Sequence, residues 1–317
     1  MEMPVEQHDL AVAWNWEYDR EFVSLIQAAA AARSLPAYLI DRHNLTETLE
    51  RLRNGSLSFN LYLDRASDED ERFLPLAQHF QRKGSTVTRV LNPYELMRRA
   101  ADKATMHLEF LTRGIHVPYT IIISPFNHKR EVELSLSELA HLGRPFIIKP
   151  ANTTGGGVGV VVGAESLKDV IETRQHHKND KYLLQEKIVP VILSNRRAWF
   201  RVFFAFGDIV LCWWDDQTHI YDVLTADEEK RFNLHTLREV AAAIHDVCGL
   251  DFFSTEIVCV SSGMLVVVDY VNEICDMRLK SRHVDGVPDQ IVELIVNRIA
   301  DMAAISRISP ISPQGGR

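Results

Sequence analysis

The feature that most constrains the fold of this chain is a glycine-rich segment between two apolar runs. Pro145–Lys149 predicts a buried strand, and Val160–Val162 predicts a second one. The connection, Thr153–Gly159, contains four glycines and no charged residue. Glycines let successive backbone N–H groups approach phosphate oxygens without a Cβ in the way. The segment therefore favours a phosphate-binding loop between strands, and a plain glycine-rich hairpin turn is the alternative.

Two common nucleotide-binding motifs are excluded at this loop. No Gly-Lys-Ser/Thr follows it, so it is not a Walker P-loop. It leads into a predicted strand rather than a helix, which excludes the dinucleotide-binding fingerprint. Lys149 ends the preceding strand and should place its ammonium group at the edge of a sheet.

The region before this loop alternates between short apolar runs and helical patterns. The runs Ala11–Trp14, Ala37–Ile40 and Phe59–Leu63 are separated by helical patterns at Glu21–Ala32 and Glu69–Lys83. This alternation is typical of a parallel sheet with helices on its faces. We expect an N-terminal α/β domain over residues 1–95, a central part over 96–181, a C-terminal part over 182–308, and a disordered tail over 309–317.

Helix and turn signals predict several boundaries. Pro93–Arg113 is expected to form one helix that ends at Gly114. A hairpin is expected to turn at Gly207-Asp208. Asn233 is the expected N-cap of a later helix whose apolar face continues to Val247.

A pair of acidic strands follows near the C-terminus. Ser254–Val260 and Met264–Val271 predict an antiparallel hairpin that can bring Glu256 and Asp269 side by side. Two adjacent carboxylates repel each other unless a cation lies between them. With the amide of Asn272 they form an oxygen-only set of the kind that suits Mg²⁺. Solvated strand edges are the alternative, with Tyr270 or Glu273 as the inward residue.

The segment Leu183–Ile188 is a third candidate. A strand that leaves its sheet has unpaired backbone groups, which can hydrogen-bond the edge of an adenine ring. An ordinary strand end is the alternative explanation of this pattern.

These signals, in this order, resemble the ATP-grasp superfamily. The resemblance extends from about Asp102 to Asp301 and, more weakly, into the first domain. It begins with Asp102-Lys103 and the strand entry Gly114-Ile115-His116-Val117-Pro118-Tyr119-Thr120. It continues through the strand lysine, the glycine loop, the Gln-Glu-x-Ile hinge, a strand arginine and the paired acidic strands. The resemblance implies an α/β fold with an N-terminal parallel domain and two lobes that clasp ATP.

The resemblance also implies a role for each matching residue. Lys103 and Lys149 would contact the ATP phosphates, and Arg201, with Lys149, would act on the transferred phosphoryl group. Mg²⁺, with Mn²⁺ as an alternative, would be held by Glu256, Asp269 and Asn272. The loop over the phosphates would contain Thr153, Thr154, Gly155, Gly156, Gly157 and Gly159. The adenine would meet Gln185, Glu186, Lys187 and Ile188.

The implied activity is that of an ATP- and Mg²⁺-dependent ligase. A small-molecule carboxylate would form an acyl phosphate, an amine or another nucleophile would displace phosphate, and ADP would be released. Arg65 and Arg278 are candidates for substrate contact. The chain departs from the family's Glu-x-Asn pattern, because two residues separate Asp269 from Asn272. A kinase of the same fold and a non-catalytic ATP-binding protein therefore stay open, as does a homodimer.

Composition limits the class of partner. The chain has 35 Lys and Arg against 43 Asp and Glu, a net charge of −8 at pH 7. Nucleic-acid binding usually requires a basic surface, so no nucleic-acid partner is expected. No apolar run is long enough to span a bilayer, so no membrane association is expected. The four cysteines form no CxxC pair and fit a reduced, cytoplasmic location.

Overall fold

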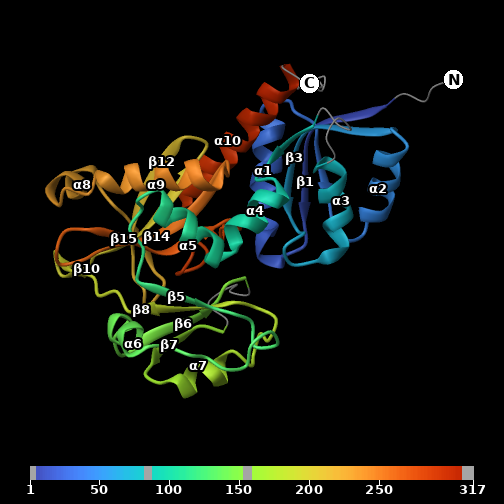
Figure 1. Ribbon diagram of the computed structural model, residues 1–317. Helices are drawn as coiled ribbons and strands as arrows, with labels where there is room; N and C mark the ends of the chain where they lie inside the picture. The colour runs from blue at the N-terminus through green and yellow to red at the C-terminus, as the bar shows by residue number, and fades with distance from the viewer. Residues whose placement is uncertain (1–4, 82–87, 153–158, 309–317) are drawn as a thin grey trace.

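The computed structural model describes residues 5–81, 88–152 and 159–308. Within these ranges the chain forms a four-stranded parallel sheet, a four-stranded antiparallel sheet, a five-stranded antiparallel sheet and a two-stranded hairpin. In Figure 1 the parallel sheet lies on the right, the five-stranded sheet at the upper left and the other antiparallel sheet below it. The predicted mixed α/β class is confirmed.

The first sheet has the strand order β2-β1-β3-β4, and all its neighbouring strands are parallel. The predicted parallel arrangement is therefore correct. Helices cover both faces, which explains why the middle of β1 is buried on both sides. The elements are β1 (Glu6–Trp14), α1 (Arg20–Ala32), β2 (Ala37–Ile40), α2 (Leu45–Arg53), β3 (Leu57–Arg65), α3 (Leu74–Gln81) and β4 (Arg89–Leu91).

The C-terminal helix α10 (Asp289–Ile308) packs beside α1 against this first sheet (Figure 1). Its Ile291 and Ile295 are buried in the same apolar cluster as Leu10 of β1 and Phe22 of α1. The last described helix thus completes the core of the first sheet. Within the described ranges, no helix has both the length and the apolar character that crossing a membrane requires.

The single helix expected over Pro93–Arg113 is wrong. The structure forms two helices, α4 (Tyr94–Ala101) and α5 (Lys103–Thr112), separated by Asp102. The backbone of Asp102 is extended, and its carboxylate accepts hydrogen bonds from two backbone N–H groups in the first turn of α5. Aspartate stabilises a helix start in this way. The break places Lys103 at the first position of α5.

The four-stranded antiparallel sheet has the order β5-β8-β6-β7. The two strands expected on either side of the glycine segment, β6 and β7, both form, and they pair antiparallel with each other. Both helices on this sheet begin with a capping box, formed by Ser135 and Glu138 and by Ser166 and Asp169. The elements are β5 (Thr120–Ile123), α6 (Leu136–Leu142), β6 (Phe146–Pro150), β7 (Val161–Ala164), α7 (Leu167–Thr173) and β8 (Tyr182–Glu186).

The five-stranded sheet has the order β13-β12-β11-β14-β15, so β15 lies at an edge. Helix α9 packs on one of its faces, and a short hairpin, β9–β10, precedes it along the chain. The elements are β9 (Ile192–Leu193), β10 (Arg196–Arg197), β11 (Trp199–Ala205), β12 (Asp208–Trp214), β13 (Tyr221–Val223), α8 (Ala226–Arg231), α9 (Thr236–Cys248), β14 (Phe252–Cys259) and β15 (Leu265–Asn272).

Two local predictions in this region are wrong. Ala205 pairs with Asp208, so the β11–β12 turn is Phe206-Gly207 rather than Gly207-Asp208. Both turn residues have positive φ, as a two-residue turn that matches strand twist requires. Asn233 is not a helix N-cap: it has a φ of 56° after α8, and α9 begins at Thr236.

Gly286 closes the loop that follows β15. A Cβ added there would lie 2.6 Å from the backbone carbonyl carbon and oxygen of Leu279. We expect Gly286→Ala to lower the free energy of unfolding by about 1–3 kcal/mol, because backbone atoms must move. Urea unfolding measures the change.

Gly263→Ala is the control for this prediction. Its added Cβ would meet nothing within 4 Å, and the strain comes only from its φ of 81°. That conformation costs an alanine about 1–2 kcal/mol. Equal stabilities of a Gly286→Ala variant and the unsubstituted chain would show that the loop yields without cost.

Candidate active site

The two acidic strands bring their carboxylates together through a β-bulge. In the antiparallel pair β14–β15, Glu256 lies opposite Asp269, and Ser254 lies opposite Asn272. The chain advances by two residues on β14 and by three on β15 between these pairs, which is the geometry of a bulge. The bulge accommodates the extra residue between Asp269 and Asn272. It also keeps the side chains of Asp269 and Asn272 near Arg201.

Arg201 lies at the centre of this group, on strand β11. Its Nη1 forms an ion pair with Glu256, and its Nε donates to Ser254 Oγ at 3.1 Å. The Asn272 amide is oriented so that its nitrogen and its oxygen both have hydrogen-bond partners. In this orientation the oxygen accepts a hydrogen bond from Arg201 Nη2 at 2.6 Å. Arg201 also lies over the Trp214 ring, with 5.4 Å between Cζ and the ring centroid. The guanidinium is thus held by both acidic strands.

Two lysines approach the same group from other elements. Lys103 Nζ, at the start of α5, lies 3.8 Å from Asp269 Oδ1. Lys149 is buried at the end of β6, where its Nζ donates to the carbonyl oxygen of Val268 at 3.0 Å. Val268 belongs to the edge strand β15, so this bond joins the two antiparallel sheets. The structure therefore brings Lys103, Lys149 and Arg201 around the two carboxylates.

Burial and neighbouring charges shift the pKa values of these groups in different directions. Burial raises the pKa of Glu256, and the adjacent Asp269 raises it further, although Arg201 opposes both. Burial would also raise the pKa of Asp269, but the charges of Lys103 and Lys149 hold it below its usual value. Burial lowers the pKa of Lys149 to about 8. The cluster is thus a partly desolvated set of opposite charges.

The donor set fits a hard divalent cation. Glu256 and Asp269 offer carboxylate oxygens side by side, and Asn272 offers an amide oxygen, which are the ligand types that Mg²⁺ takes. Among the described residues, no three His, Cys, Asp or Glu side chains form a metal-binding group. Mg²⁺ usually completes a protein set of one or two carboxylates with oxygens from water and phosphate.

In the candidate adenine segment, the side chains of Gln185 and Glu186 are hydrogen-bonded to neighbouring strands and loops. Gln185 is buried, and its amide donates to Thr120 Oγ1 at 2.9 Å and to Tyr270 Oη at 2.7 Å. Glu186 accepts from the backbone N–H of Tyr119 at 2.7 Å. Lys187 and Ile188 follow the end of β8, and no backbone hydrogen bond joins either to another described residue outside the strands.

Part of the glycine loop lies outside the described residues, namely Thr153, Thr154, Gly155, Gly156 and Gly157. Gly159 is described and has a φ of 78°. A Cβ at Gly159 would lie 3.1 Å from His177 Nε2, so this end of the loop combines a left-handed backbone with close packing.

The two arginines proposed for substrate contact lie outside the charge cluster. Arg65 is buried, with its Nε 2.9 Å and its Nη2 2.5 Å from the two carboxylate oxygens of Asp19. Its Nη2 also donates to the carbonyl oxygen of Cys275 at 3.0 Å. Arg278 pairs with Asp276 and Asp285 at 2.6 and 3.0 Å. The Arg65 guanidinium therefore ties the loop after β15 to Asp19, whereas the Arg278 guanidinium joins two parts of that loop to each other.

Two aromatic residues at the cluster were missed as functional candidates. The indole Nε1 of Trp199 donates to Glu256 Oε2 at 3.0 Å. Strand alternation could have found it, because Trp199 and Arg201 are two residues apart and share a face of β11. Tyr270 lies beneath Lys149, with 5.2 Å between the ammonium nitrogen and the ring centroid. The sequence offers Tyr270 as an alternative inward residue of the acidic hairpin, but no local pattern assigns its contact with Lys149, which lies on the other antiparallel sheet.

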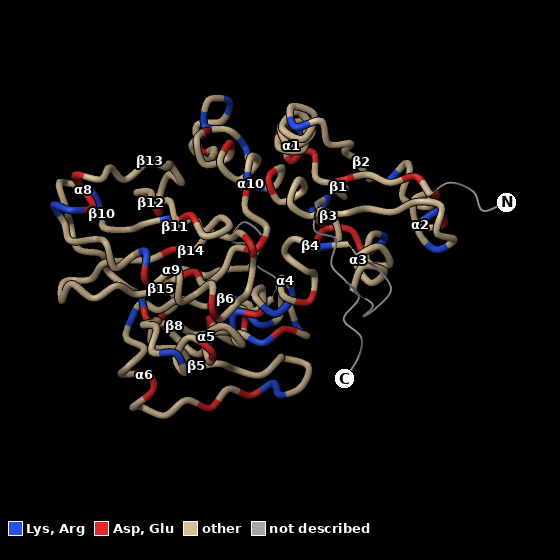
Figure 2. The backbone as a smooth tube through the Cα atoms, turned by 90° about the horizontal axis from the view of Figure 1, so that it is seen from above, with Lys and Arg blue, Asp and Glu red and all other residues tan. Residues whose placement is uncertain are grey.

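A separate cavity of about 750 Å³ lies beyond the carboxyl ends of the first three parallel strands. Ligands of parallel α/β sheets bind at such strand ends. Charged residues of both signs are distributed over the whole molecule (Figure 2), and this cavity also carries both signs. Its lining residues are Trp14, Asn15, Trp16, Glu17, Arg20, Asp41, Arg42, His43 and Glu69.

No protein-family model matches the sequence, and no curated protein matches it. Solved structures match over nearly the whole chain. A RimK-domain ATP-grasp protein from Sphaerobacter thermophilus is 22% identical, with a TM-score of 0.59 over 92% of this chain and 98% of that one. D-alanine–D-alanine ligase from Bacillus anthracis, in complex with ATP, is 13% identical, with a TM-score of 0.65 over 96% of this chain and 99% of that one.

The ATP-grasp ligase PsnB, in complex with a minimal precursor, Mg and ADP, is 14% identical. Its TM-score is 0.61, over 95% of this chain and 99% of that one. The matches include both the parallel first sheet and the two antiparallel sheets, because they span nearly all of each chain. The fold expected from the order of the motifs is confirmed, and the chain has the ATP-grasp fold.

Proposed function

We propose that this chain is an ATP- and Mg²⁺-dependent ligase that joins a carboxylate to an amine or another nucleophile, with release of ADP and phosphate. The observation that supports it is the convergence of Lys103, Lys149 and Arg201 on the carboxylates of Glu256 and Asp269. Phosphoryl transfer depends on positioning and charge neutralisation more than on covalent help from the protein. This cluster offers fixed charges of both signs in a partly desolvated site.

In the proposed reaction, Lys103 and Lys149 hold the triphosphate. A carboxylate oxygen of the substrate attacks the γ-phosphorus, and the bond from that phosphorus to the ADP oxygen breaks. Arg201 neutralises charge on the transferring phosphoryl group. The amine then attacks the acyl carbon, phosphate leaves with the bonding electron pair, and the amine loses a proton.

Glu256, Asp269 and Asn272 are proposed to hold Mg²⁺, which when bound offsets the negative charge of the phosphates. Arg201 bonds to both Glu256 and Asn272, so it links this oxygen set to the position of the transferred group. Trp199 donates to the second oxygen of Glu256 and so fixes the orientation of that carboxylate.

A screen of ADP release against pooled amino acids, hydroxy acids, acidic peptides and amines tests the proposal. A ligase should release ADP and free phosphate in equal amounts, together with an amide product that mass spectrometry identifies. Phosphate recovered on the product rather than in solution would indicate a kinase. Tight Mg-ATP binding without ADP release across the screen would indicate a non-catalytic ATP-binding protein.

The pH dependence of ATP use should follow the charge of Lys149. Burial lowers its pKa to about 8, so the ammonium is mostly charged at pH 7 and mostly neutral at pH 9. Only the charged form attracts the triphosphate. We expect the KM for ATP to rise about tenfold from pH 7 to pH 9, as the charged fraction falls. Steady-state kinetics at pH 7, 8 and 9 measure it.

Lys149→Arg is the matched control, because arginine keeps its charge over this range. Its KM for ATP should be nearly independent of pH, whatever its absolute value. The same rise with pH in both proteins would assign the titration to another group.

A further inference from the structure

Tyr270 is a buried side chain beside the charge cluster with both hydrogen bonds and ring contacts, and the proposed function leaves it without a role. It is fully buried, whereas the side chain of the preceding Asp269 is 36% exposed. Successive residues of a strand point to opposite faces. The bulge between Asp269 and Asn272 adds one residue at this point. Tyr270 therefore points inward, while Asp269 and Asn272 stay near Arg201.

The hydroxyl of Tyr270 joins residues from three elements. Gln185 Nε2, on β8 of the other antiparallel sheet, lies 2.7 Å from Tyr270 Oη. His107 Nδ1, on α5, lies 2.7 Å from the same oxygen. Burial and the charge of Lys149 lower the pKa of His107 to about 4, so its imidazole is neutral at pH 7. The Tyr270 hydroxyl can therefore donate to His107 while its oxygen accepts from Gln185.

This chain of hydrogen bonds continues beyond Gln185. The same Gln185 amide nitrogen donates to Thr120 Oγ1 at 2.9 Å, and Thr120 Oγ1 donates to the carbonyl oxygen of Pro118 at 2.9 Å. The network thus runs from the edge strand of the five-stranded sheet to the strands of the other sheet. Buried networks of this kind hold their members in one geometry when every group is paired.

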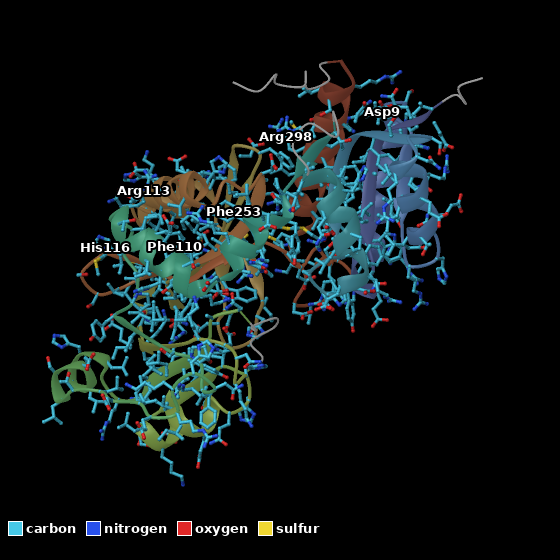
Figure 3. The ribbon with its side chains drawn as sticks, turned by 45° about the vertical axis from the view of Figure 1, so that its right-hand side comes forward. Asp9, Phe110, Arg113, His116, Phe253 and Arg298 are labelled. Carbon is cyan, nitrogen blue, oxygen red and sulfur yellow. The ribbon has the colours of Figure 1, made fainter. Side chains whose placement is uncertain are left out.

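The ring of Tyr270 supports the buried lysine. Lys149 Nζ lies 5.2 Å from the ring centroid, within the range of a cation–π interaction. Phe110 of α5, labelled in Figure 3, meets the ring at an interplanar angle of 70°, with 5.4 Å between the centroids. The ring is therefore held on one side by α5 and faces the ammonium group of Lys149.

We propose that Tyr270 is a positioning residue that locks the two antiparallel sheets in register, so that Lys149 and the oxygen set of Asp269 and Asn272 keep the geometry needed for phosphoryl transfer. This inference rests on the proposed function. Tyr270 does not contact ATP in this role: its hydroxyl fixes β8 and α5 relative to β15, and its ring fixes the ammonium group.

Tyr270→Phe tests the proposal, because it keeps the ring and removes only the hydroxyl. The kcat for ADP release should fall about tenfold or more, since small displacements of catalytic groups have large effects on rate. The KM for ATP should change less than threefold. In calorimetric titrations with ADP present, the affinity for Mg²⁺ should fall about tenfold, as for the loss of other groups that orient metal ligands.

Tyr182→Phe is the matched control. Tyr182 is also fully buried and also makes two hydrogen bonds, from its hydroxyl to the Thr173 carbonyl oxygen and from the His177 backbone N–H. All of these residues lie within one sheet and its own helix, so no bond between the sheets is lost. Its kcat and its Mg²⁺ affinity should stay within twofold of those of the unsubstituted chain.

Gln185→Met keeps the Tyr270 hydroxyl but removes its partner on β8. It should reproduce the loss of kcat in Tyr270→Phe, and the double variant should lose little more than either single one. Unchanged kcat and Mg²⁺ affinity in Tyr270→Phe would overturn the proposal, as would additive losses in the double variant. If the unsubstituted chain releases no ADP with any substrate, the proposed function fails, while the Mg²⁺ titrations still decide the role of Tyr270.

Discussion

Replacement of Glu256 by alanine is expected to lower ATP turnover at least about a hundredfold and to weaken Mg²⁺ binding in the presence of ADP. The substitution removes one of the two adjacent carboxylates and takes away the partner of the buried Arg201. A buried charge that loses its partner is strongly unfavourable. Steady-state ADP release and calorimetric titration of Mg²⁺ measure the two effects.

Glu229→Ala is a suitable control for this result. Glu229 also pairs with an arginine, Arg238, in this case through both carboxylate oxygens, but it lies on α8 at the surface and outside the charge cluster. Its ATP turnover should stay within twofold of that of the unsubstituted chain. A Glu256→Ala variant that keeps full Mg²⁺ affinity would remove Glu256 from the proposed metal set.

The largest effect on stability is expected at Arg65. Arg65 and Asp19 form a two-point ion pair in which each side chain is only 1% exposed. In Arg65→Met the Asp19 carboxylate keeps its burial but loses its counter-charge, and the Cys275 carbonyl loses a donor. We expect the free energy of unfolding to fall by about 3–5 kcal/mol. Urea unfolding followed by tryptophan fluorescence measures it.

Two further variants separate burial from charge pairing. Arg278→Met breaks ion pairs with Asp276 and Asp285 that are 30–40% exposed on the acidic side, and should cost about 0–1 kcal/mol. The double variant Arg65→Met with Asp19→Leu removes both buried charges and should recover much of the lost stability. Equal losses at Arg65 and Arg278 would show that the burial of the Asp19 pair has no special effect.

Local sequence patterns suffice for the parts of the site that lie within one strand or one hairpin. The apolar run before Lys149 predicts β6, and the alternation around Glu256 and Asp269 predicts the β14–β15 pair. These patterns depend on only a few neighbouring residues, so contacts with distant parts of the chain do not change the strands that they predict. The same reasoning fails at Asp102, because its carboxylate stabilises a new helix start inside a region that is otherwise helical in pattern.

Contacts between distant elements cannot be obtained from such patterns. Two helices and a strand separate Arg65 from its partner Asp19 in the sequence, and nothing in the spacing selects Asp19. Likewise, Gln185 shows a strand-end pattern, but its amide bonds to Tyr270 across two sheets. Only the order of several motifs, taken as a resemblance to a known fold, predicts that Lys103 approaches Asp269.

The placement of α10 has a consequence for how the chain is made. Strands β1 and β3 emerge from the ribosome first, but one side of their core includes Ile291, Ile295 and Ile299 of α10. At a synthesis rate of about 5–20 residues per second, roughly 10–45 seconds separate β3 from this helix. During that interval the nascent sheet exposes an apolar face, so its folding depends on completion of the polypeptide and on protection of that face until then.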